Sequence, residues 1–300
     1  MLKEKRWDAM ATDFGDSKFD MKILSSSHIN FLFGAGVNGK AFPQFNGFAK
    51  TLNKLKEFGC KKINLEEAIN ELEDESQKSK IQSIFIDELK EKNREIQYDS
   101  ISIQNIKSLF QIINQVIEDS ENRTNSMKQV NVYTLNYDQI IETSLNQMGL
   151  LVNKISSSNL DQFEKLFNIV AYDYSIKKYL PTYLISKIHG DLDNPILPGI
   201  NKYDDMLQAK RFELLFKMKE HLSRPCSLLF VIGYSGHDKH INSILADCLK
   251  TGLTLYWVMF SEKDSLPGSL INEPVFFLKG DGEKDSTSLL TERICQSWVK

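Results

Sequence analysis

The chain has 300 residues, of which 41% are hydrophobic, enough for a large hydrophobic core and too many for a disordered chain. Its 37 lysine and arginine residues nearly balance its 40 aspartate and glutamate residues, so direct nucleic-acid binding is not expected. The four cysteines, Cys60, Cys226, Cys248 and Cys295, form no C-x-x-C pair, which argues against both a disulfide framework and a zinc module held by four thiolates.

The chain starts with the charged and polar segment MLKEKRWDAM, which lacks the apolar core of a signal peptide. No segment reaches the roughly 18–20 consecutive apolar residues that a membrane span requires. We therefore expect a cytoplasmic protein without a membrane anchor.

Short apolar runs alternate with helical patterns along the chain, which is typical of an α/β protein with a parallel sheet and helices on both faces. Most of these runs are followed by glycine, asparagine or aspartate, as buried strands often are. The predicted strands are Ile29–Phe33, Val130–Leu135, Ile185–His189, Leu228–Ile232, Leu253–Phe260 and Val275–Leu278.

Almost a hundred residues separate the first two predicted strands, far more than one crossover helix needs. Residues 63–72, 81–89 and 101–117 each place apolar residues at three- and four-residue spacing, which predicts amphipathic helices. We expect one domain over residues 1–300, with residues 60–125 as an inserted helical subdomain. Residues 201–222 predict another helix, and residues 151–184 give no clear prediction.

A glycine-rich segment follows the first predicted strand directly. Gly34-Ala35-Gly36-Val37-Asn38-Gly39 matches G-x-G-x-x-G, a pattern in which glycines let the backbone approach a pyrophosphate. Pro43 suits the first turn of a helix, so we expect the next helix to start near residue 43. The alternative is a tight turn without a ligand, because this motif alone is a weak signal.

Polar residues alternate with other residues after the second predicted strand. Thr134, Asn136 and Asp138 would point to one side of an extended chain, at the carboxyl edge where open α/β sheets bind ligands. Asp138 has the alternative role of capping a helix at 139–148. Asn136 has the alternative role of forming a turn.

Two later segments add candidates at neighbouring strand ends. His189 ends a predicted strand and can accept a proton near neutral pH; the alternative is a core histidine that bonds the backbone. Gly233, Ser235 and Gly236 form a second flexible loop before a helix predicted at 237–249, where Ser235 has the alternative role of N-cap. His237 and His240 are three residues apart, but no third ligand is spaced nearby, so no metal site is predicted.

Taken together and in this order, five motifs resemble one family. They are GAG at 34–36, TLNYD at 134–138, KIHGDL at 187–192, IGYSGHDKHIN at 232–242 and LKGDG at 278–282. The combination resembles the sirtuin-like NAD-hydrolase domain of bacterial antiphage defence systems. This resemblance implies a Rossmann-like parallel sheet with helices on both faces and an inserted smaller domain, with NAD bound as a substrate between them.

The resemblance also implies roles for individual residues. Asn136 and His189 would act on the nicotinamide ribose, and Asp138 would support that pocket, so these three are the predicted catalytic residues. No metal is implied in the reaction. The predicted NAD-binding residues are Gly34, Ala35, Gly36, Val37, Asn38, Thr134, Gly233, Tyr234, Ser235 and Gly282.

The departures from deacylating sirtuins indicate which reaction to expect. The zinc module with two C-x-x-C pairs is missing, and AFPQFNGF at 41–48 replaces the usual loop after GAG, so we expect NAD hydrolysis to nicotinamide and ADP-ribose. The alternatives are a catalytically silent NAD or ADP-ribose sensor and a protein deacylase. The resemblance further implies a gated effector of antiviral defence that forms a homo-oligomer or a complex with a separate partner, such as a HerA-type ATPase.

Overall fold

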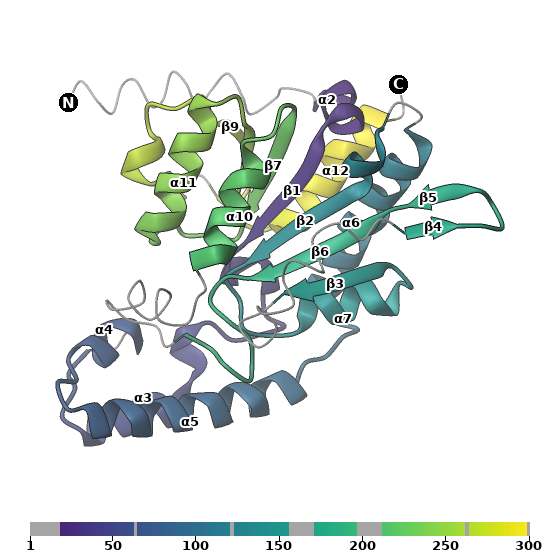
Figure 1. Ribbon diagram of the computed structural model, residues 1–300. Helices are drawn as coiled ribbons and strands as arrows, with labels where there is room; N and C mark the ends of the chain where they lie inside the picture. Colours follow the sequence, from purple (N-terminus) through teal and green to yellow (C-terminus); the bar gives the residue numbers. More distant parts are fainter. Residues whose placement is uncertain are drawn as a thin grey trace.

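A computed structural model describes residues 19–62, 65–120, 123–155, 171–196, 212–261 and 264–298. Its centre is a seven-stranded sheet with the order β3-β6-β2-β1-β7-β8-β9 (Figure 1), and every neighbouring pair of strands is parallel. The strands are β1 (His28–Phe33), β2 (Gln129–Thr134), β3 (Leu151–Ile155), β6 (Thr182–Lys187), β7 (Ser227–Ile232), β8 (Thr254–Met259) and β9 (Phe276–Lys279).

Each of the six predicted apolar runs overlaps one of these strands. Residues 151–184, for which no clear prediction was possible, contain the edge strand β3 and the antiparallel hairpin of β4 (Ala171–Asp173) and β5 (Lys178–Leu180). The reason is their exposure, since only the last residue of β3 is buried and β4 and β5 contain no buried residue. Strands with little burial lack the apolar run that identifies a core strand.

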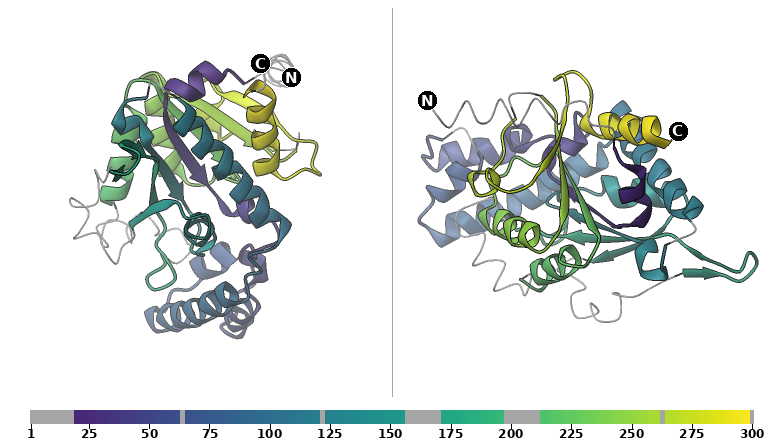
Figure 2. Two further views of the ribbon diagram at one scale, coloured as in Figure 1. Left: turned by 90° about the vertical axis from the view of Figure 1, so that its right-hand side faces the viewer. Right: turned by 90° about the horizontal axis from the view of Figure 1, so that it is seen from above.

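Helices cover both faces of the sheet (Figure 2). Because side chains alternate along a strand, Phe31 packs into one core and Leu32 into the other. One face carries α2 (Met21–Ser26), α6 (Ile101–Asp119), α7 (Ile140–Gln147) and α12 (Ser286–Trp298), and the other carries α10 (Phe212–Leu222) and α11 (Lys239–Lys250). The predicted Rossmann-like sheet with helices on both faces is therefore confirmed.

None of the helices in the described ranges combines the length and apolarity needed to cross a bilayer. The helix predicted at 201–222 corresponds to α10 from residue 212 onward. Residues 201–211 lie outside the described residues.

The helices between β1 and β2 form two groups in the structure, and the outlying group starts before residue 60, where the predicted subdomain begins. On α6, Phe110 packs against the rings of Phe31 and Phe33, with centroids 5.6 and 6.0 Å apart, so this helix belongs to the layer on the sheet. Three other helices lie away from the sheet in the lower part of Figure 1. They are α3 (Ala49–Glu57), α4 (Leu65–Asn70) and α5 (Glu75–Arg94).

An aromatic chain connects these outlying helices to the sheet. The Phe48 ring lies 5.1 Å from that of Phe85 on α5, and Phe85 packs edge-on against Tyr137 just beyond β2 at 5.7 Å. The prediction of a helix start near Pro43 is wrong, because α3 begins at Ala49. The loop after β1 therefore extends to Phe48 and places aromatic side chains between the sheet and the helical insertion.

The central strands β1, β2 and β7 end side by side. Phe33 pairs with Thr134 on one side and with Ile232 on the other, so the three following loops leave the sheet at one level. The chain continues from β1 to β2 on one side and returns to β7 on the other side. This is a topological switch point, where open α/β sheets bind ligands.

Glycines let the loops after β1 and β7 pack backbone against backbone. Gly34 N–H donates to Ile232 O at 3.0 Å, and Gly36 N–H donates to Gly233 O at 2.9 Å. A Cβ on Gly34 would lie 2.4 Å from Gly233 O, and a Cβ on Gly233, whose φ is +65°, would lie 2.2 Å from Val37 N. These glycines are therefore required for contact between the loops, a role that the sequence pattern did not reveal.

We expect Gly233→Ala to destabilise the protein far more than Gly252→Ala. Both glycines have positive φ, but a Cβ on Gly252 (φ +102°) meets no atom within 4 Å. In the control, the free energy of unfolding should therefore fall only by the roughly 1–2 kcal/mol that a left-handed backbone costs. In Gly233→Ala, overpacking should lower it by about 1–3 kcal/mol more. Chemical unfolding of both variants measures the difference, and equal losses would show that the loop contact does not constrain position 233.

Candidate active site

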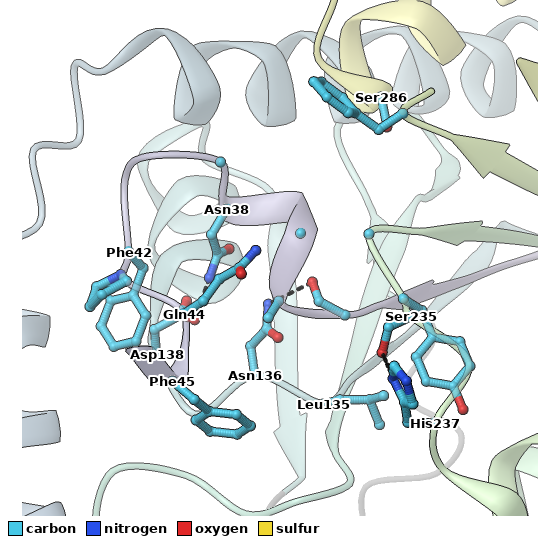
Figure 3. Close-up of a pocket in the computed structure, with 18 of the residues that line it drawn as sticks. Asn38, Phe42, Gln44, Phe45, Leu135, Asn136, Asp138, Ser235, His237 and Ser286 are labelled. Carbon is cyan, nitrogen blue, oxygen red and sulfur yellow. Dashed lines mark hydrogen bonds between the residues drawn. The ribbon is translucent and has the colours of Figure 1, made fainter. Parts of the chain in front are cut away.

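A cavity of about 820 Å³ opens at the carboxyl ends of the central strands. Ten predicted residues line it, and they come from the ends of four strands. These residues are Gly34, Ala35, Gly36, Asn38, Asn136, Asp138, His189, Gly233, Tyr234 and Ser235. Figure 3 labels four of them, Asn38, Asn136, Asp138 and Ser235. The amide of residue 136 and the imidazole of residue 189, although 53 positions apart in the sequence, thus face the same space.

Three predicted binding residues do not line the cavity. Val37 is 1% exposed and packs in the hydrophobic core. Thr134 Oγ1 accepts a hydrogen bond from the backbone N–H of Asn136 at 3.1 Å, and Gly282 N–H donates to Phe260 O at 2.9 Å. Thr134 and Gly282 therefore contact the backbone of Asn136 and Phe260, which line the cavity themselves.

The side chain of Asn136 is fixed by the glycine loop. It is 7% exposed, and its Nδ2 donates to Gly34 O at 3.2 Å. Within the described part of the chain no donor reaches its Oδ1. The amide oxygen is therefore available to accept a hydrogen bond from a water molecule or a ligand hydroxyl.

Asp138 uses its two carboxylate oxygens for different purposes. Oδ1 accepts the backbone N–H of Ile140 at 2.9 Å. Ile140 is the first residue of α7 and Gln139 is its N-cap, so Asp138 bonds the start of the helix without occupying the N-cap position. Oδ2 accepts from Asn38 Nδ2 at 2.7 Å (Figure 3) and connects the loops after β1 and β2. The buried Oδ1 of Asn38 has no hydrogen-bond partner among the described residues, so it is an acceptor open to a ligand.

A buried lysine beneath the cavity stabilises this corner. Lys187 is fully buried; its Nζ donates to the backbone oxygen of Asp138 and forms an ion pair with Glu142 at 3.1 Å. Burial raises the pKa of Asp138, and the positive charge of Lys187 together with the N–H donors partly opposes this increase. Lys187 was a missed functional candidate, and its signal was a lysine within a predicted buried strand.

His189 lies between the cavity and the start of α11. It is 4% exposed, and its Nε2 lies 3.5 Å from Oδ1 of Asp238. Asp238, not Ser235, occupies the N-cap position of α11. Ser235 Oγ instead bonds Nδ1 of His237 at 2.7 Å, so His237 turns toward its own loop, while the ring of His240 lies 6.4 Å from that of His189.

Two groups of lining residues were not predicted from the sequence. The aromatic group comes from the long loop after β1 and from β8 and its end, and the acidic group comes from separate elements. Phe42, Phe45, Phe48, Trp257 and Phe260 form the first group, and Glu66, Asp238, Asp264 and Asp285 form the second. No lysine or arginine is among the described residues that line the cavity, which favours positive charge on a ligand near these carboxylates.

Residues 130–275 match the family model described as SIR2-like domain. The match covers slightly less than half of the chain and includes the ends of β2, β6 and β7. The predicted resemblance to sirtuin-like domains is therefore supported over this segment. No curated protein is significantly similar to the chain in sequence.

Two solved structures are similar to the chain over most of its length. One is described as "Structural Basis for the Mechanism and Regulation of Sir2 Enzymes", with a TM-score of 0.46, 14% identity and coverage of 93% of this chain and 97% of that chain. The other is a mutant Sir2 homologue in complex with 2'-O-acetyl ADP ribose, with a TM-score of 0.45, 13% identity and coverage of 93% and 95%.

We expect Asp138→Asn to keep or raise the thermal midpoint at neutral pH. Burial raises the pKa of Asp138, so the folded state binds its proton more tightly than the unfolded state does. The stability from this group is therefore full below the unfolded pKa and is lost as pH rises through the folded pKa. Asparagine removes that loss, and the advantage should shrink toward pH 4.

Asp173→Asn is a control of opposite sign, because hydrogen bonds from Ser175 lower the pKa of this exposed carboxyl. Its carboxylate stabilises the fold above the unfolded pKa, so this variant should gain nothing at neutral pH. Thermal unfolding between pH 4 and 8 measures the midpoints of both variants and of the unaltered chain. A fall of more than about 4 °C for Asp138→Asn at neutral pH, roughly 1 kcal/mol or more, would contradict the predicted direction.

Proposed function

We propose that the chain hydrolyses the bond between nicotinamide and ribose in NAD and releases nicotinamide and ADP-ribose. The observation that supports this proposal best is the shared cavity, in which Asn136, Asp138 and His189 face the loops at Gly34–Gly36 and Gly233. Its volume of about 820 Å³ lies within the range of small-molecule sites.

The electrostatics of the cavity suit this reaction. As the glycosidic bond breaks, positive charge develops on the anomeric carbon and the ribose oxygen, and fixed negative groups in a dry site stabilise such charge. Asp138 is 2% exposed, and the lining residues in the described ranges supply further carboxylates and no lysine or arginine. The bonding electrons pass to the pyridinium nitrogen, so nicotinamide leaves as a neutral molecule.

The two remaining residues would act on the nucleophile. The Oδ1 of Asn136 would orient a water molecule or a ribose hydroxyl, because Nδ2 is engaged by Gly34 O. His189 would take the proton that the attacking water loses as its oxygen bonds to the anomeric carbon. Asp238, 3.5 Å from His189 Nε2, would favour the imidazolium that results and is a positioning residue.

Neutral groups would hold the rest of the substrate. Ser235 and Ser286 line the cavity at the ends of β7 and at the start of α12, where hydroxyls and the helix N-terminus favour phosphate oxygens. The aromatic side chains of Trp257 and Phe260 at the end of β8 would contact the adenine.

We expect His189→Ala to slow NAD cleavage by about 10²–10⁴-fold, the usual contribution of a general base, and Asn136→Ala to slow it by about 10²–10³-fold. Asn146→Ala makes the same chemical change at an exposed position of α7 and should leave the rate unchanged. Chromatographic quantification of nicotinamide and ADP-ribose measures all three variants, with circular dichroism to verify folding. Full NAD consumption by either cavity variant refutes the role of that residue.

The same assay distinguishes the alternatives. Transfer of an acyl group from an acyl-lysine peptide to ADP-ribose would indicate a deacylase. Calorimetric binding of NAD without turnover, in the presence of a partner, would indicate a sensor.

We further propose that the hydrolase is a gated effector of antiviral defence in the cytoplasm, because uncontrolled NAD loss would harm the cell that makes it. Gating would come from homo-oligomerisation or from a complex with a separate partner such as a HerA-type ATPase. We expect static light scattering to detect an assembly of the chain alone or with the product of its neighbouring gene, and NAD cleavage to rise in that assembly. A monomer with constitutive activity would contradict this gating.

A further inference from the structure

Three potential metal ligands converge beside the cavity. His189 follows β6, Asp238 caps α11, and His240 lies in the first turn of that helix. One ligand atom from each lies within 4.8 Å of the other two. The sequence pattern had suggested only His237 and His240 as a pair, but His237 bonds Ser235 instead, and His189 takes its place.

The composition and spacing of this cluster suit a divalent transition metal. Two imidazoles and one carboxylate form a nitrogen and oxygen set that binds zinc at about 2.0–2.2 Å, which separates ligands on a tetrahedral ion by roughly 3.3–3.5 Å. His189 Nε2 and Asp238 Oδ1 are already 3.5 Å apart. Small side-chain rotations would bring His240 to the same spacing.

The surroundings of the cluster are rigid and largely dry. His189 is 4% exposed, and the side chain of Asp238 is 15% exposed. Tyr234 Oη accepts from the backbone N–H of Asp238 at 3.1 Å and donates to Asn242 Oδ1 at 2.9 Å, which fixes the first turn of α11. Because Asp238 also lines the cavity, a water molecule in the cavity can supply a fourth ligand, as in three-ligand zinc sites.

We propose that His189, Asp238 and His240 bind a divalent transition-metal ion such as zinc, and that the bound ion blocks NAD cleavage. The ion takes the imidazole lone pair that would otherwise accept the proton of the attacking water. It also places two positive charges beside a carbon on which positive charge develops. Inhibition by the bound ion rests on the proposed NAD hydrolysis, whereas the proposal that the three residues bind a metal does not depend on that reaction.

Cobalt(II) titration followed by visible absorption tests the site directly, because the d–d bands report tetrahedral nitrogen and oxygen ligation without any turnover. His240→Phe keeps an aromatic ring beside His189 and removes the nitrogen ligand. Since even an outer-sphere partner changes metal affinity by roughly 10–100-fold, we expect this variant to lose at least as much. His237→Ala removes the histidine that is not in the cluster and should keep the affinity of the unaltered chain.

Zinc should inhibit NAD cleavage by the unaltered chain at one ion per chain, and a chelator should restore it. His240→Phe should cleave NAD at the unaltered rate and resist zinc. Equal cobalt affinity in His240→Phe and the unaltered chain would overturn the metal site, and equal zinc inhibition would overturn the block. If the chelator-treated chain does not cleave NAD, the proposed hydrolase fails, while the cobalt spectra still decide the metal site.

Discussion

The loops after β1 and β7 touch through their backbones at Gly34, Gly36 and Gly233, and the geometry of the candidate site depends on this contact. Any Cβ on these residues would lie within 3 Å of a backbone atom of the opposite loop. The contact holds Gly34 O where it accepts from Asn136, while Asn38 in the same loop donates to Asp138. Three adjacent strand ends are thereby joined into one wall of the cavity, and the side chains that would act on a substrate sit on a rigid frame.

The central strands β1 and β7 could be predicted because their burial restricts their composition. The runs Ile29–Phe33 and Leu228–Ile232 are apolar because both faces of their strands are covered, and they gave the central strands correctly. The edge strand β3 escaped prediction since burial did not restrict its composition, whereas the opposite edge strand β9 has an apolar sequence and was predicted. The helix predicted to start near Pro43 failed for another reason: a proline suits a loop as well as a first helical turn, and local sequence does not distinguish the two.

The site could be predicted where strand ends carried unusual polar residues. Asn136, Asp138 and His189 stood out because they are polar residues at or just beyond the ends of predicted strands, and parallel strands place such residues at one edge. The residues that sequence could not assign depend on contacts across the fold. The distance from His189 to Asp238, the position of Lys187 under Asp138 and the approach of α12 to the cavity all arise from packing between segments 45 or more positions apart.

Asn136 and His189 are proposed to act on the same bond of one NAD molecule. A double-mutant cycle measures this directly, because residues that act as a unit have strongly non-additive effects on rate. The rate of NAD cleavage would be determined for the unaltered chain, for Asn136→Ala, for His189→Ala and for the double variant. We expect the double variant to be about as slow as the slower single variant, whereas a loss equal to the product of the two single losses would contradict a shared role of the two residues.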